Sequence, residues 1–152
     1  MRYRAALVMI LVVPMCSAAF PSPAVAGGDR LAEVAQERIN ALRADNGLRA
    51  LRGSRALARS ASAYARYMLR REYFGHLSRI RGSRRFGSLG EIILLHRGTH
   101  GRPRLAVRNW ARSPGHRSLM LGSRYRRIGV GKASGSLGGR RVTTWVVHVG
   151  RR

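Results

Sequence analysis

The sequence predicts an α+β domain in which helices come first and a β-hairpin comes last. Two stretches, 29–46 and 54–70, carry apolar residues at helical spacing, and a third helix opens at Pro103. After residue 127 the apolar residues recur at every second position, which is typical of strands. Helices and strands that occupy separate parts of a chain indicate the α+β class.

The first two helices are marked by their caps as well as by their spacing. Asp29 is a good N-cap for the helix over 29–46, and Gly47 is the expected stop after it. Ser54 has the same capping role for the helix over 54–70. The apolar stripe of the first helix is Leu31, Val34, Ala35, Ile39 and Leu42, and that of the second is Leu57, Ala58, Ala61, Tyr64, Ala65, Met68 and Leu69.

The third helix is expected to begin at Pro103, because a proline in the first helical turn loses no hydrogen bond. It continues through Trp110, whose position in the apolar pattern predicts packing in the core. The segment 113–115, Ser-Pro-Gly, is expected to break this helix. His116 then begins a short apolar turn.

A β-hairpin is predicted at the C-terminal end. Strands are expected over 127–132 and 141–149, and the glycine-rich segment 135–139 reverses the chain between them. Trp145 lies on the face shared with Thr143 and two valines, so we expect it to pack in the core.

The N-terminus has the three-part pattern of a secretory signal. Arg2 and Arg4 precede an apolar segment over 5–15, and Ala-Val-Ala at 24–26 is a small-x-small cleavage site. The apolar segment is shorter than the roughly 20 residues that a membrane-spanning helix needs, which disfavours the alternative of a retained anchor. We expect residues 1–26 to be a cleavable signal, residues 27–152 to form one domain, and this domain to be secreted.

Charge and cysteine content narrow the class of partner. The chain has a formal charge of +24, and it keeps +22 when Arg2 and Arg4 leave with the signal. Two interpretations stay open: binding of anionic cell-envelope polymers or lipids, or arginines that follow base composition and cover solvated faces. No motif for specific nucleic-acid recognition is present, and we expect a monomer. The only cysteine, Cys16, also leaves with the signal, which excludes disulfide scaffolds and thiolate metal sites.

Residues able to carry acid–base or metal chemistry are few, with five histidines and six acidic residues. The sequence has no Gly-rich phosphate loop, no Gly-x-Ser-x-Gly elbow and no His-Glu-x-x-His helix, which disfavours the commonest hydrolases and nucleotide-binding proteins. His96 and His100 are predicted to be solvated loop residues, because a glycine lies between them. His148 is predicted to be half-buried and hydrogen-bonded near the end of a strand.

A set of short motifs is dispersed along the chain, and no single one is specific without the others. The motifs are the opening helix with Ile39-Asn40-Ala41-Leu42-Arg43, Gly47-Leu48 and Leu51, the Ala-rich second helix, Phe74-Gly75-His76, Gly90-Glu91-Ile92, Trp110 with Ser113-Pro114-Gly115-His116-Arg117-Ser118-Leu119-Met120, and Ile128-Gly129-Val130-Gly131. In this order the chain resembles the bacterial branch of the CAP superfamily, which includes cysteine-rich secretory proteins, antigen 5 and pathogenesis-related proteins. The resemblance covers nearly all of residues 27–152.

The resemblance implies a fold and a site. The fold is a three-layer α-β-α sandwich, with a small antiparallel sheet flanked by helices and a further strand around 91–95. His76, Glu91 and His116 would converge on one open cleft, where they are the candidate catalytic residues. His76 and His116 would be the ligands of a divalent ion such as zinc.

Two departures from the family pattern weaken the case for hydrolysis and for metal binding. Many animal and plant members have a second cleft glutamate where this chain has Ser113, and Ile92 stands in the usual place of an asparagine. With one carboxylate, the cleft has less negative charge to hold a cation and lacks a second acid–base group.

Three functions stay open. The leading hypothesis is a secreted binding or interaction module. One alternative is a metal-assisted hydrolase of peptide or ester bonds, with His116 or Glu91 activating water and His76 holding the ion. The other is a lipid or sterol carrier. A purely structural role for the polar residues of the cleft is the remaining interpretation, and Ser113 and Ser118 lack the third member of a catalytic triad.

Overall fold

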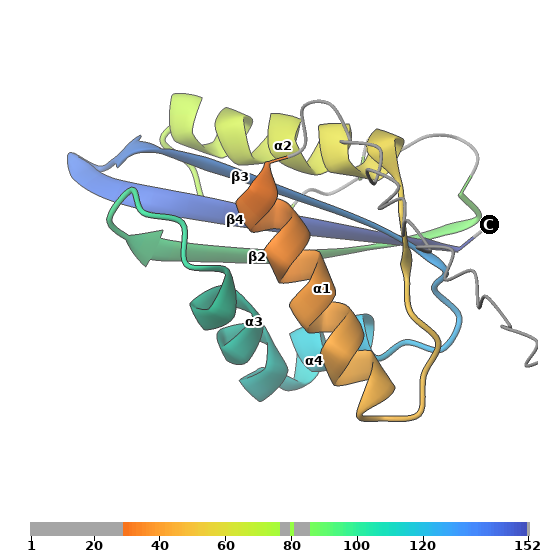
Figure 1. The fold of residues 1–152 in the computed structure, drawn as a ribbon. Helices are drawn as coiled ribbons and strands as arrows, with labels where there is room; N and C mark the ends of the chain where they lie inside the picture. Colours follow the sequence, from red (N-terminus) through yellow and green to blue (C-terminus); the bar gives the residue numbers. More distant parts are fainter. Residues whose placement is uncertain (1–28, 77–79, 81–85, 152) are drawn as a thin grey trace, which may run out of the picture.

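The computed structural model describes residues 29–76, 80 and 86–151, so the predicted signal at 1–26 lies outside the described residues. Helices and strands alternate irregularly along the described part (Figure 1). In chain order they are α1 (Arg30–Ala44), β1 (Arg52–Gly53), α2 (Arg55–Arg70), β2 (Ser88–Arg97), α3 (Pro103–Arg112), α4 (Pro114–Met120), β3 (Arg127–Leu137) and β4 (Arg140–Arg151). None of the helices in this part of the chain has the length and apolarity that crossing a bilayer requires.

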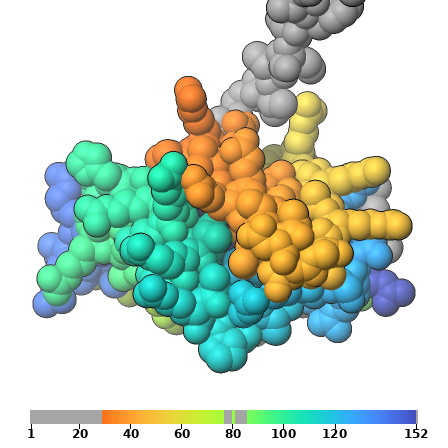
Figure 2. All heavy atoms as spheres, turned by 60° about the horizontal axis from the view of Figure 1, so that its bottom comes forward, coloured from red at the N-terminus to blue at the C-terminus, as the bar shows by residue number. Residues whose placement is uncertain are grey.

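The elements form the expected three layers. The strands lie in the order β1-β3-β4-β2, with α2 on one face of the sheet and α1, α3 and α4 on the other (Figure 1). In Figure 2 the atoms of α1 lie directly against those of α3 and α4, so these helices cover their face together. The predicted α+β sandwich is thereby confirmed.

Each face of the sheet has its own core, because successive strand residues point to opposite sides. On the side of α1, α3 and α4 the larger core contains Trp110 and Trp145, both fully buried as predicted. On the side of α2 a smaller core contains Tyr64, Met68 and Val146. Glu91 on the edge strand β2 and His148 on the neighbouring strand β4 lie on the α2 side of the sheet.

The sheet is mixed, whereas the resemblance implied a small antiparallel sheet. The three long strands are antiparallel, with β4 between β3 and β2. The two-residue strand β1 pairs in parallel with Arg127 and Ile128 at the start of β3. A strand this short has no recognisable period, so its pairing is decided by the distant segment that it meets.

The hairpin is longer and its turn tighter than predicted. β3 continues to Leu137 and β4 begins at Arg140, which leaves Gly138 and Gly139 as the turn. Both glycines have positive φ, 57° and 72°, as a type I′ turn requires. The twist of such a turn matches that of the two strands, so pairing extends almost to the turn itself.

The helix boundaries also differ at two places. α1 ends at Ala44, two residues before the predicted end, and α4 starts at Pro114, inside the segment expected to be only a break. Ser113 is the C-cap of α3 and the N-cap of α4. Pro114 stops α3, since it has no N–H to donate, and is tolerated as the first residue of α4 for the same reason.

Candidate functional site

The centre of the candidate site is a carboxylate on β2 paired with a histidine on β4. Glu91 and His148 are direct cross-strand partners, and both face the α2 side of the sheet. His148 Nε2 lies 3.0 Å from Glu91 Oε2. The His148 side chain is fully buried and that of Glu91 is 5% exposed. His148 is therefore more buried than the half-buried histidine predicted from the sequence.

His76 reaches the other oxygen of the same carboxylate. Its Nδ1 lies 3.0 Å from Glu91 Oε1, and its side chain is 56% exposed. Because an ionised carboxylate only accepts hydrogen bonds, both imidazoles donate to it. His76 then carries its proton on Nδ1, which leaves Nε2 as an acceptor or a metal ligand. His148 Nδ1, which has no hydrogen-bond partner among the described residues, then carries a lone pair rather than an orphaned N–H.

The reversal at the end of α2 brings His76 to this position. Tyr73 N–H donates to Met68 O and Glu72 N–H to Leu69 O, which is the Schellman arrangement. Glu72 takes the left-handed conformation (φ 48°) that usually belongs to glycine at this place. The chain then returns along α2, where the Tyr64 hydroxyl donates a 2.5 Å hydrogen bond to the carbonyl of Gly75.

His116 approaches from α4, on the opposite layer of the sandwich. β2 is an edge strand, so groups from both layers can meet around it. Gly90 permits the approach of α4, because a Cβ there would lie 2.8 Å from Leu119 Cδ2. The His116 and His76 rings are 6.2 Å apart between centroids and tilted by 45°. The structure thus brings together all three residues singled out in the sequence.

Burial and charge shift two pKa values around the carboxylate. Burial, and then the negative charges of Glu91, Tyr73 and Tyr67, raise the pKa of Tyr64 to about 12. Burial lowers the pKa of His116, and the positive charge of His76 lowers it further. Tyr64 is therefore a neutral donor at ordinary pH, and His116 favours its neutral form. We name His76, Glu91, His116 and His148 the His/Glu cluster.

His96, His100 and Ser118 are not part of this cluster. His96 is in β2 rather than in a loop, where it accepts a 3.2 Å hydrogen bond from Trp145 Nε1. His100 is exposed, as predicted. Ser118 Oγ donates to Gly115 O within α4, so it is engaged with its own helix.

The pH dependence of stability should carry a contribution from His116. Its folded pKa lies below the ordinary 6.5, so the unfolded chain takes up the proton first as the pH falls. Stability is therefore expected to decrease below about pH 6.5, and the decrease ends once the pH lies below the folded pKa. Thermal melts with a chelator present should show a weaker pH dependence of Tm in His116→Gln than in the parent. Equal slopes would contradict this assignment.

The model of the cysteine-rich secretory protein family, CAP, matches residues 36–149. A search of the curated proteins finds no match. Among solved structures, the fold is similar to an extracellular protein containing an SCP domain from Bacillus anthracis, with a TM-score of 0.66 and 21% identity. That likeness covers 81% of this chain and 41% of the Bacillus chain, so this chain spans about two fifths of that protein.

Two further structures extend the likeness beyond one kind of organism. An outer surface protein of Borrelia burgdorferi has a TM-score of 0.65 and 18% identity, covering 82% of this chain and 94% of its own. Venom allergen-like protein 4 of Schistosoma mansoni has a TM-score of 0.64 and 14% identity, covering 82% of this chain and 90% of its own. At identities this low, the similar structures establish only the fold. The family assignment rests on the family model, which matches three quarters of the sequence. The chain belongs to the CAP family of cysteine-rich secretory proteins.

Proposed function

We propose that this protein is a secreted binding module whose His/Glu cluster, together with neighbouring aromatic side chains, contacts the ligand. CAP proteins are typically secreted, and two of the similar structures are an extracellular protein and an outer surface protein. The observation that carries the proposal is the position of the exposed aromatics. In the part of the chain that the structure describes, the exposed large hydrophobic side chains are Tyr67, Tyr73 and Phe74, all within ten residues of His76.

Exposed aromatic rings beside a polar cluster are typical of recognition sites, where they supply contact area with few rotatable bonds. Tyr67 stacks on Tyr64 with ring centroids 6.0 Å apart, so the exposed ring is held by a buried one. Arg71 lies over the same Tyr67 ring, with its guanidinium carbon 6.0 Å from the ring centroid. An anionic ligand group would find positive charge here at Arg71.

The chemistry of the cluster favours binding over hydrolysis. Both oxygens of Glu91 accept hydrogen bonds from imidazoles, so the carboxylate orients two rings and is poorly placed to take a proton from water. The position of the second family glutamate is Ser113, a helix-cap residue. Among the described residues no group of three or more His, Cys, Asp or Glu side chains could hold a metal ion together, so the three protein ligands that catalytic zinc sites usually have are not found there.

A divalent ion such as zinc would therefore have two protein ligands, His76 and His116. Their donor chemistry fits zinc: the Nδ1–H of His76 is held by a carboxylate, which is the usual support for a zinc-bound imidazole. The neutral form of His116, favoured by its lowered pKa, is the form that binds metal. When bound, the ion would supply a Lewis-acidic contact for an anionic ligand group, while Glu91 keeps His76 oriented.

Calorimetric titration with zinc tests this part of the proposal. The purified exported protein is expected to take up one zinc, and His76→Ala/His116→Ala is expected to lose the uptake. His100→Ala removes an exposed histidine that is not part of the His/Glu cluster. It serves as the matched control, and its zinc uptake should equal that of the parent. Equal uptake by all three proteins would contradict a site at His76 and His116. Turnover of a mixed peptide library that disappears in Glu91→Gln would instead support a metal-assisted hydrolase.

A further inference from the structure

A second candidate binding site lies between α1 and α2, at the edge of the sheet formed by β1 and β3. It is a groove of about 1010 Å³, and it shares no residue with the His/Glu cluster. Its floor is made by small or apolar side chains from both helices and from β3. The lining residues on the floor are Ala32, Gly53, Ala58, Ile128 and Val130.

The two walls of this groove carry opposite charges. Glu33 and Glu37 of α1 lie on one side, and Arg55, Arg59 and Arg66 of α2 lie on the other. Spacings of four and seven along α2 place the three arginines on one helical face. All five side chains are exposed, and none of them takes part in an ion pair within the described residues. A ligand in the groove could therefore form ion pairs with the glutamates of one wall and the arginines of the other.

The floor of the groove includes an incompletely paired strand edge. β1 pairs only with Arg127 and Ile128, and β3 continues to Leu137. Within the described part of the chain no other strand lies on that side of β3. The carbonyl of Ile128 accepts from Ser54 N–H, so it points to this edge. The main-chain N–H and C=O groups of successive strand residues point to opposite edges, so those of Val130 and Lys132 point to the same edge as those of Ile128.

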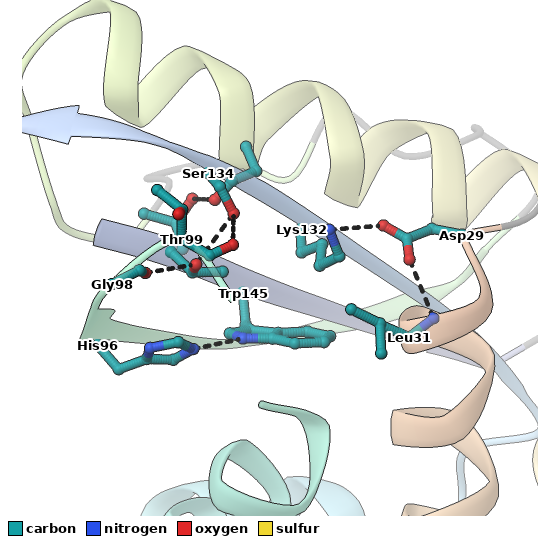
Figure 3. A network of polar contacts seen from close by, with 11 residues as sticks. Asp29, Leu31, His96, Gly98, Thr99, Lys132, Ser134 and Trp145 are labelled. Carbon is teal, nitrogen blue, oxygen red and sulfur yellow. Dashed lines mark hydrogen bonds and ion pairs between the residues drawn. The ribbon is translucent and has the colours of Figure 1, made fainter. Parts of the chain in front are cut away.

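One end of the groove is fixed by an ion pair that links α1 to β3. Lys132 Nζ lies 3.0 Å from Asp29 Oδ2, and the other oxygen of Asp29 caps α1 at Leu31 N–H (Figure 3). At the other end, β1 leaves the sheet at Gly53 and the chain turns into α2. An added strand would therefore continue along β3 where β1 stops.

We infer that this groove binds an extended peptide segment of a partner protein, which adds to the edge of β3 and carries basic and acidic residues in alternation. The alternation follows from the layers of the fold. Ile128 and Val130 face α1, whereas Gly129 and Gly131 face α2. Successive side chains of an added strand would point in turn to the acidic wall of α1 and the basic wall of α2.

Two isomeric peptides test the inference directly. One alternates lysine and glutamate, and the other places all its lysines before all its glutamates. At physiological ionic strength the alternating peptide is expected to bind the purified exported protein roughly tenfold tighter or more than its isomer. Glu33→Gln/Glu37→Gln is expected to abolish the preference. Glu72→Gln, which removes one exposed glutamate outside the groove, is expected to keep it.

Backbone pairing is tested on the peptide, so the protein needs no change. N-methylation of every second residue removes the donors on one edge of an extended strand. Of the two possible methylation patterns, one should abolish binding and the other should preserve it, because only one edge meets β3. Equal binding of the two isomers, equal effects of the two methylation patterns, or a preference for the alternating peptide that survives in Glu33→Gln/Glu37→Gln would each overturn the inference.

Discussion

Replacing Gly129 with alanine is expected to lower the free energy of unfolding by about 3 kcal/mol, the upper part of the usual range for overpacking. α2 lies directly on β3 at this point. A methyl group on Gly129 would overlap the backbone nitrogen of Ala58 and the backbone carbon of Leu57. Backbone atoms inside a helix cannot move aside as a side chain can, so α2 would have to shift as a whole.

Gly131 is in the same situation one helical turn further along, where its methyl group would overlap the backbone of Ser62. Gly129→Ala/Gly131→Ala is therefore expected to leave little folded protein. Urea unfolding followed by circular dichroism measures both effects. Gly87→Ala is the matched control, because no atom of the described residues lies within 4 Å of a Cβ there and its φ is not positive. If Gly129→Ala and Gly87→Ala unfold at the same urea concentration, the close contact of α2 with β3 is wrong.

The helices and the hairpin could be predicted because their signals are local. Caps at Asp29 and Ser54 and a regular apolar spacing mark α1 and α2, and both caps accept the hydrogen bonds expected of them. The start of α4 could not be separated from a break, since Pro114 ends one helix and begins another. β1 was not predicted, because a parallel strand of two residues depends on a partner 75 positions away.

The site residues likewise divide into those marked by local motifs and one placed by strand pairing between distant segments. His76, Glu91 and His116 were singled out by the resemblance, and the fold brings them together. His148 was missed as a site residue, since only the register of β2 with β4 places it opposite Glu91. The available signal was the strand alternation, which puts His148 on the same face as Val146.

Arg43 is a second residue whose role depends on a distant segment. It follows Ile39 by four positions and so lies on the apolar face of α1, where it is 1% exposed. Its Nη1 donates to the carbonyls of Met120 and Gly122, at 2.6 and 3.2 Å, which fixes α1 to the end of α4. Burial lowers the pKa of Arg43, and Arg126 lowers it further. An arginine on an apolar stripe indicates burial, but its partners are set only by the fold.

Replacing Glu91 with alanine is expected to cost about 3 kcal/mol of stability, because it removes the hydrogen-bond partner of a fully buried histidine. His148 Nδ1 has no hydrogen-bond partner among the described residues, so the loss of Glu91 would leave both ring nitrogens without a partner there. Glu91→Gln should cost less, since its amide oxygen can still accept from one imidazole. Glu33→Ala removes the same charge from an exposed helix position and should change stability by less than about 0.5 kcal/mol.

A double-mutant cycle separates this pairing from the cavity that the alanine creates. His148→Phe removes the buried imidazole while keeping an aromatic ring, so Glu91→Ala in that background no longer strands a buried N–H. If the pairing carries the effect, the loss caused by Glu91→Ala should be smaller by about 1–2 kcal/mol in His148→Phe than in the parent. Purely additive losses would mean that the Glu91–His148 hydrogen bond contributes no stability, and that the carboxylate is retained for His76. Zinc uptake by the Glu91→Ala protein, which has no acceptor for His76 Nδ1–H at this position, would then show whether the carboxylate orients His76 for the metal.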